Sequence, residues 1–227
     1  MISAKRTGRT IGLLLLLHLI TGLMTPYMLL QQLTRPLTFA GIDSINGFQV
    51  RLAIMMLSVG GAIPVVIAIT GMPVFRKSSY AMALWLFALA IANFALQGGE
   101  IAGYMSLFTF SQNYVSANAA DLSVHELVGA TVRSAWKWIH YTHLLIMVSW
   151  IFFLGVMLWK SAVVPRILVA LLLITALLQI TGITLPQFLA YRSPNLMLMG
   201  VPLAFAYLGL SVWLMIKGFR ITEEATV

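Results

Sequence analysis

Six long apolar runs, separated by short polar connections, constrain the fold of this chain more than any other feature of its sequence. They cover residues 11–33, 52–74, 81–104, 138–159, 167–188 and 196–216. Each run holds about the 20 apolar residues that a helix needs to cross the hydrocarbon core of a bilayer. Six crossings and their connections use nearly all of the 227 residues. The sequence therefore predicts an all-α fold, a bundle of six transmembrane helices that forms a single transmembrane domain over residues 1–227.

The charged residues are too few for a soluble protein. They make up 9% of the chain, whereas soluble domains carry about 25%. The formal net charge is +8, but the cations stand singly or in pairs at the ends of the apolar runs, as in membrane helices. No stretch of the sequence combines clustered Lys or Arg with stacking aromatic residues, so no nucleic-acid partner is expected. The chain has no cysteine, which excludes disulfides, thiolate metal ligands and a cysteine nucleophile.

The first apolar run is expected to be a transmembrane helix and not a cleaved signal peptide. It continues beyond the usual length of a signal peptide, and no pair of small residues at cleavage spacing follows it.

The distribution of the 14 Lys and Arg residues predicts the orientation of the bundle. Nine of them lie in the two termini and in the connections after the second and fourth runs: Lys5, Arg6, Arg9, Arg76, Lys77, Lys160, Arg166, Lys217 and Arg220. The other three connections hold five: Arg35, Arg51, Arg133, Lys137 and Arg192. Because cytoplasmic loops carry the excess of cations, both termini are expected in the cytoplasm. The longest connection, residues 108–137, would then face outward and could hold a short amphipathic helix on the membrane surface.

Three segments spread along the chain carry a resemblance to a known family. They are Arg9-Thr10-Ile11-Gly12-Leu13-Leu14 with Thr21-Gly22, then Leu154-Gly155 with Lys160-Ser161 and Pro165-Arg166-Ile167-Leu168, and finally Trp213-Leu214-Met215-Ile216-Lys217-Gly218. In these segments the chain resembles domain-of-unknown-function family 4386, a family of bacterial six-helix membrane proteins. The resemblance implies six helices and a multi-pass location in the bacterial cytoplasmic (inner) membrane. It implies no activity and no site residues.

Polar residues recur at helical spacing within the apolar runs and predict a polar seam inside the bundle. In the third run these residues are Asn93, Gln97, Glu100 and Tyr104, at i, i+4, i+7 and i+11. On the fourth helix one face carries His140, His143, Met147 and Trp150, with Trp136 just before the run. The first run offers a face with His18, Thr21, Gly22 and Thr25, and the fifth a face with Thr175, Gln179 and Gly182. Residues at this spacing share one helix face. Polar groups within membrane helices normally face the bundle interior or a wet cavity.

The depth of these residues places a candidate pocket in the outer half of the bundle. At about 1.5 Å per residue, His140 and His143 lie roughly 5–10 Å below the outer boundary, and Glu100 reaches the same layer from the third run. Glu100 is the single acidic residue within an apolar run. Its charge is expected to be balanced by Lys137 or by a histidine. The predicted ligand pocket opens outward and comprises Gln97, Glu100, Tyr104, Lys137, His140, His143 and Gln179.

The favoured interpretation of this pocket is non-enzymatic. Aromatic residues beside a few convergent polar groups are the usual composition of a ligand site, so the protein would bind or translocate a small amphipathic or lipid-like ligand among the membrane lipids. A structural interpretation stays open, because intramembrane ion pairs often only satisfy each other. The chain would then be a structural or assembly subunit, with a membrane partner or further copies of itself as a homo-oligomer.

A metal site is the remaining alternative. His140 and His143 at i, i+3 could both reach one zinc ion, and Glu100 could complete a His₂Glu set with water in the open position. Such a site would support hydrolysis at the outer leaflet by a zinc-dependent enzyme. Haem fits less well, because His18 and His143 differ in depth by about 10 Å in a core of about 30 Å. His18 is expected instead to be held by a hydrogen bond between helices.

Overall fold

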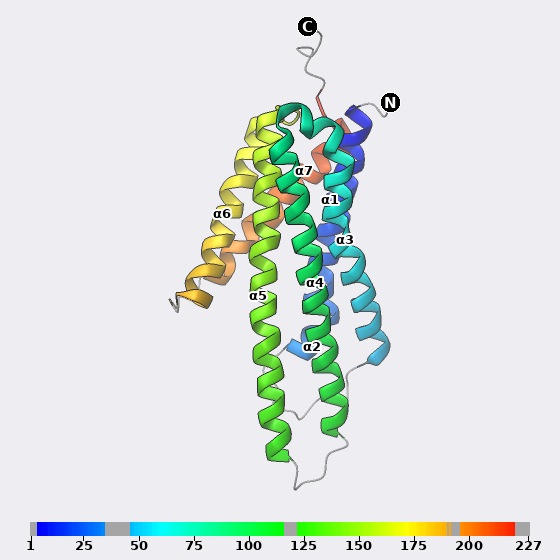
Figure 1. Ribbon diagram of the computed structural model, residues 1–227, viewed down its shortest axis with the longest axis vertical. Helices are drawn as coiled ribbons and strands as arrows, with labels where there is room; N and C mark the ends of the chain where they lie inside the picture. Colours follow the sequence, from blue (N-terminus) through cyan, green and yellow to red (C-terminus); the bar gives the residue numbers. More distant parts are fainter. Residues whose placement is uncertain (1–3, 35–45, 116–121, 190, 192–195, 221–227) are drawn as a thin grey trace.

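The structure, a computed structural model, describes residues 4–34, 46–115, 122–189, 191 and 196–220. In this part of the chain there are helices and no strands, and six helical segments are long and apolar enough to cross a membrane. These are α1 (Ala4–Met24), α3 (Gly47–Ser78), α4 (Tyr80–Val115), α5 (Leu122–Ser161), α6 (Arg166–Phe188) and α7 (Val201–Lys217), the last preceded by the 3₁₀ turn Leu196–Gly200 (Figure 1). The predicted all-α, six-helix membrane fold is confirmed.

The helices pack so that both termini lie at one end of the bundle. Figure 1 shows the start of α1, the end of α7, the α3–α4 turn and the α5–α6 turn together at the top. The most extensive helix pairs are α4 with α5, α3 with α4, and α1 with α7. This arrangement gathers at one end the described cations that were assigned to the cytoplasmic side, and the side of the membrane that this end faces stays a prediction. Arg35 and Arg192, counted at the opposite end, lie outside the described residues.

The prediction that residues 108–137 form a polar connection between helices is wrong for most of this stretch. Helix α4 continues to Val115 and α5 already begins at Leu122, so this stretch extends two transmembrane helices instead of holding a separate surface helix. Figure 1 shows these extensions of α4 and α5 projecting beyond the other helices. The sequence contains no proline between Pro73 and Pro165. With no residue that removes a backbone donor, the polar side chains end the apolar run without ending the helix.

The first apolar run is also divided, although the prediction treated it as one helix. Helix α1 ends at Met24 and is followed by a π-helical turn, Thr25–Leu29, and the short helix α2 (Gln31–Thr34). The backbone N–H of Leu30 donates to the carbonyl of Thr25 at 3.0 Å, five residues back. Pro26 stands in the first turn of this segment, where its missing N–H is best tolerated.

Two glycines of α1 allow its backbone to touch the end of α7. A β-carbon at Gly8 would overlap the backbone of Gly218 and Phe219, and one at Gly12 would lie 2.6 Å from the backbone nitrogen of Met215. Small residues permit this close approach of membrane helices. The contact ties the first helix to the last.

We expect Gly8→Ala to lower the free energy of unfolding by about 1–3 kcal/mol, the usual cost of inserting a methyl group into a closely packed contact. The matched control is Gly22→Ala on the same helix, where a β-carbon meets nothing within 4 Å. Alanine there should leave stability unchanged or raise it slightly through helix propensity. Thermal unfolding in detergent measures both variants, and equal melting temperatures would contradict the packing of α1 on α7.

Candidate functional site

The antiparallel pairing of α4 and α5 determines which polar side chains meet. Gly99 and Gly103 face α5: a β-carbon at Gly99 would lie 3.6 Å from Ile139, and one at Gly103 would lie 2.9 Å from Trp136. These small residues bring the two helices close together. Glu100, which lies between them in sequence, is therefore within reach of the polar face of α5.

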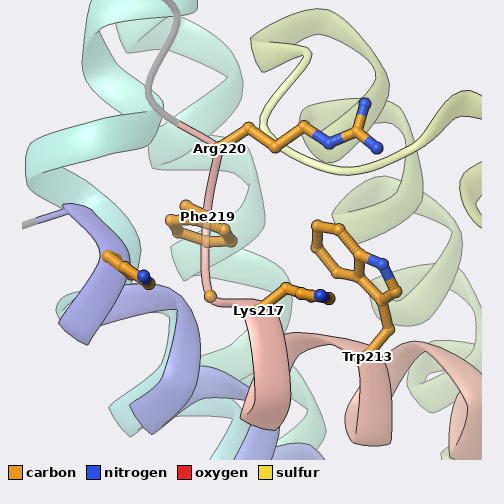
Figure 2. A pocket seen from close by; sticks show the side chains of 6 residues that line it. Trp213, Lys217, Phe219 and Arg220 are labelled. Atoms are coloured by element: carbon orange, nitrogen blue, oxygen red, sulfur yellow. The ribbon is translucent and has the colours of Figure 1, made fainter.

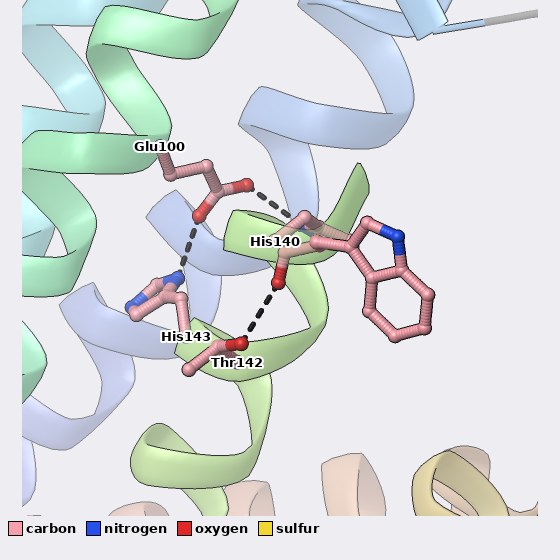
Figure 3. Close-up of polar contacts among 5 residues, drawn as sticks. Glu100, His140, Thr142 and His143 are labelled. Atoms are coloured by element: carbon pink, nitrogen blue, oxygen red, sulfur yellow. Dashed lines mark hydrogen bonds and ion pairs between the residues drawn. The ribbon is translucent and has the colours of Figure 1, made fainter. Parts of the chain in front are cut away.

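Glu100, His140 and His143 form one hydrogen-bonded group, here called the Glu100 cluster. The Nδ1 atom of His140 lies 2.7 Å from Oε1 of Glu100, and the Nδ1 atom of His143 lies 2.6 Å from Oε2 (Figure 3). Each carboxylate oxygen thus has its own imidazole. Glu100 and His143 are each 4% exposed, whereas the side chain of His140 is 24% exposed. The cluster is therefore buried within the helix pair and reaches the surface at His140.

The partner of Glu100 is a pair of histidines and not Lys137. Both possibilities followed from the sequence. Lys137 is exposed, and its ammonium lies 5.8 Å from the centre of the Tyr141 ring. An ionised carboxylate accepts hydrogen bonds and cannot donate them, so both imidazoles donate their Nδ1–H to Glu100. Their Nε2 atoms consequently carry a lone pair when the imidazole is neutral and a proton when it is charged.

The Nε2 atom of His143 is the part of the cluster that lacks a partner. It is fully buried and has no hydrogen-bond partner among the described residues. In Figure 3 this nitrogen points away from Glu100. Burying a polar atom without a partner is costly, and the cost is greater in a membrane interior. The position thus has the chemistry to accept a hydrogen bond from a bound group.

Aromatic rings cover one side of the cluster. The indole of Trp136 stacks on the ring of His140, with the ring centres 5.3 Å apart and the planes at 18°. Tyr104, which is 1% exposed, lies with its ring centre 5.3 Å from that of Trp136. The indole nitrogen of Trp136 is buried and also has no partner among the described residues. The surroundings of His140 on this side are therefore aromatic, and the one polar atom of the Trp136 ring is buried with them.

Gln97 and Gln179, the two glutamines of the predicted pocket, lie in different parts of the bundle. Gln97 is buried one turn inward from Glu100 and packs against α3, where a β-carbon on Gly61 would lie 2.8 Å from its Cγ. Gln179 on α6 faces Gly200, at the start of α7. The structure thus brings Gln97, Tyr104 and the Glu100 cluster together along α4 and α5. It places Lys137 on the exposed surface and Gln179 beside a different helix end.

Asn93 and Trp136 also belong to this region, although they are not among the residues of the predicted pocket. Asn93 is 1% exposed, and both polar atoms of its side-chain amide lack a partner among the described residues. It stands seven residues before Glu100, which places it about 10 Å along α4 towards the α3–α4 turn. The signal was present, because Asn93 and Trp136 share the helix faces of Glu100 and His140. The polar seam therefore continues from the Glu100 cluster along α4 towards the α3–α4 turn.

His18 belongs to a separate contact between the first and last helices. Its Nδ1 lies 3.0 Å from the hydroxyl of Tyr207, and its ring meets the indole of Trp150 edge-on with ring centres 6.0 Å apart. The expected hydrogen bond between helices is confirmed.

The three residues proposed as zinc ligands lie together, but the carboxylate stands between the two imidazoles. Both carboxylate oxygens and both Nδ1 atoms bond to each other, which leaves the Nε2 atoms as the nitrogens able to bind a metal. Within the described ranges, no group of three His, Cys, Asp or Glu side chains is arranged to hold a metal ion.

Comparison with known proteins identifies a family. The model of a family described as a domain of unknown function, DUF4386, matches residues 10–218. Searches of curated proteins and of solved structures give no match. With six helices able to cross a membrane and a family match over nearly the whole chain, the protein is a multi-pass membrane protein that belongs to the DUF4386 family.

Proposed function

We propose that the protein binds or translocates a small amphipathic ligand at the Glu100 cluster, and that the ligand carries a hydrogen-bond donor such as a primary ammonium group. The single observation that carries this proposal is the buried Nε2 of His143, which has no partner among the described residues. With both termini in the cytoplasm, the cluster lies in the outer half of the membrane.

The cost of the cluster supports a ligand-binding role over a purely structural one. Ionisable side chains within a membrane are expensive and usually mark a site of function. Packed apolar residues of similar volume often stabilise a protein as well as a buried ion pair does, or better. A helix pair that needed only to associate would gain little from burying a carboxylate and two imidazoles. The tight contact of α4 with α5 at Gly99 and Gly103 already joins these helices.

The chemistry of the cluster defines the class of ligand. With both imidazoles neutral, the carboxylate gives the cluster a charge of −1, and each Nε2 offers a lone pair. A group with N–H donors and a positive charge complements both features. The half-buried rings of Trp136 and Tyr141 supply aromatic surface that suits an apolar tail and attracts cations. The partly exposed side chain of His140 gives such a ligand its point of approach.

The test uses n-octylammonium as the probe. Its binding to purified protein in nanodiscs of zwitterionic lipid is measured by equilibrium dialysis, with empty nanodiscs as the reference. We expect saturable binding that weakens about 10- to 100-fold in Glu100→Gln, the range that corresponds to a hydrogen bond with a charged group. Glu126→Gln is the matched control, because Glu126 is exposed and is the other acidic residue of the described part of the chain.

Two further probes define the recognition chemistry. Octyltrimethylammonium has the same charge and tail but no N–H, so it should bind much more weakly than octylammonium. Octanoate has the opposite charge and should not compete. If Glu100→Gln binds octylammonium as the parent protein does, the proposal is wrong and the structural role of the cluster takes its place. Stoichiometric zinc, lost in His140→Ala/His143→Ala, would favour the hydrolase alternative through the two Nε2 atoms.

A further inference from the structure

A second candidate site lies at the opposite end of the bundle from the Glu100 cluster, where the chain termini are. A cavity of about 390 Å³ opens there, here called the basic pocket, lined by Lys5, Trp213, Lys217, Gly218, Phe219 and Arg220 (Figure 2). Its volume is within the range of about 300–1,000 Å³ that is typical of ligand sites. Three of these six residues are cations. No acidic residue of the described part of the chain lines the pocket.

The backbone around the basic pocket is fixed by close contacts. Gly218 has φ +70, a conformation that favours glycine, and a β-carbon there would overlap the carbonyl of Lys5. The N–H of Arg220 donates to the carbonyl of Val163 in the α5–α6 turn at 2.9 Å. Phe219 is 2% exposed, and its ring packs against Phe75 of α3. Residues 218–220 are thus held between α1, α3 and the α5–α6 turn, which fixes the backbone from which Arg220 extends.

The side chains of the basic pocket combine positive charge with an aromatic wall. The guanidinium of Arg220 lies 5.7 Å from the centre of the Trp213 ring, within the range of a cation–π contact. Figure 2 shows Lys217 between Phe219 and Trp213. The side chains of Lys5, Lys217 and Arg220 are exposed, so their charges remain available to an anion. Arg9 adds to the charge nearby, since it donates to the carbonyl of Ile216 at 3.2 Å.

From this geometry we infer that the basic pocket binds the phosphate headgroup of an anionic phospholipid. Basic pockets between helix ends on the cytoplasmic side are suited to anionic headgroups. The position favours a lipid over a soluble phosphate, because the pocket lies at the ends of membrane helices and Trp213 is of the residue type enriched at the membrane interface. Lys5, Lys217 and Arg220 contact the phosphate, and Trp213 lies against the glycerol and the upper part of the acyl chains.

The test is a competition experiment on purified protein in zwitterionic detergent. Binding of phosphatidylglycerol with a fluorescent label on its acyl chain is followed by fluorescence anisotropy. We expect unlabelled phosphatidylglycerol to displace it and phosphatidylcholine with the same chains not to. Lys217→Gln/Arg220→Gln should weaken binding about 30-fold, from the usual contribution of two cations at an anionic membrane surface.

The control variant is Arg76→Gln/Lys77→Gln, which removes two cations at the same end of the bundle but outside the basic pocket. It should bind the labelled lipid as the parent protein does. Equal losses in the two double variants would overturn the inference in favour of unspecific surface charge. Equal competition by inorganic phosphate and phosphatidylglycerol would overturn the lipid assignment. Thermal unfolding of the Lys217→Gln/Arg220→Gln protein beside the parent protein shows whether the variant is folded.

Discussion

Glu100→Ala is expected to lower the free energy of unfolding by about 3–5 kcal/mol, the range found when one partner of a buried ion pair is removed. The change leaves the Nδ1–H groups of His140 and His143 without the two oxygens that accept from them. One of these imidazoles is buried, so water cannot replace the lost bond at low cost. Unfolding in mixed micelles with increasing sodium dodecyl sulfate measures the loss.

Two other variants separate the effect of the hydrogen bonds from that of the charge. Glu126→Ala removes an exposed acidic side chain from α5 and should change stability by less than about 0.5 kcal/mol. Glu100→Gln keeps the volume and one oxygen acceptor but presents an N–H₂ group to the second imidazole, so its loss should be intermediate. Equal stability of Glu100→Ala and the parent protein would show that the cluster is not formed in the membrane.

His143→Ala is expected to destabilise the protein more than His140→Ala, although both imidazoles bond to the same carboxylate. A hydrogen bond to a charged group contributes about 1.5–3 kcal/mol. Removal of the buried His143 also leaves a cavity that the helix pair cannot easily fill. At His140 the side chain is 24% exposed, so the surroundings can rearrange and part of the loss is recovered.

A double-mutant cycle isolates the bond between His143 and Glu100. The stabilities of His143→Ala, Glu100→Ala and the combined variant should show a coupling of about 1–3 kcal/mol, because the two residues share one hydrogen-bond network. The corresponding cycle with His125→Ala, at a histidine of the α5 extension, should give no coupling. Additive losses for His143 and Glu100 would mean that the 2.6 Å contact does not persist in the membrane.

The six helices could be predicted because the length of each apolar run and the cations at its ends can be read from the sequence without knowledge of how the helices pack. The helix ends could not. The apolar run ends after Tyr104, and the polar residues beyond it predict that the helix ends there too. Helix propagation depends instead on backbone hydrogen bonds, and no proline interrupts them between Pro73 and Pro165. At Pro26 the opposite occurred, and an apolar run that continued without a break concealed a change of helix type.

The candidate site was predictable to the level of a helix face. The spacing of Glu100 on one helix and of His140 and His143 on the next placed all three in one layer. The choice between Lys137 and the histidines depended on the register and closeness of α4 and α5, which the contacts of Gly99 and Gly103 determine. The helical spacing of Gln179 places it on the same face as Thr175 and Gly182. What this face contacts depends on how α6 packs against α5 and the start of α7, and the sequence pattern of one helix does not determine that packing.

The most direct test of the ligand-binding account is nuclear magnetic resonance of ¹⁵N-histidine-labelled protein during titration with octylammonium. The chain has four histidines, and single substitutions assign their signals. We predict that His140 and His143 carry the proton on Nδ1 before the titration, and that octylammonium shifts their Nε2 signals while those of His125 stay unchanged. Saturable binding of octylammonium with unmoved His140 and His143 signals would contradict the account, because the ligand would then bind away from the Glu100 cluster.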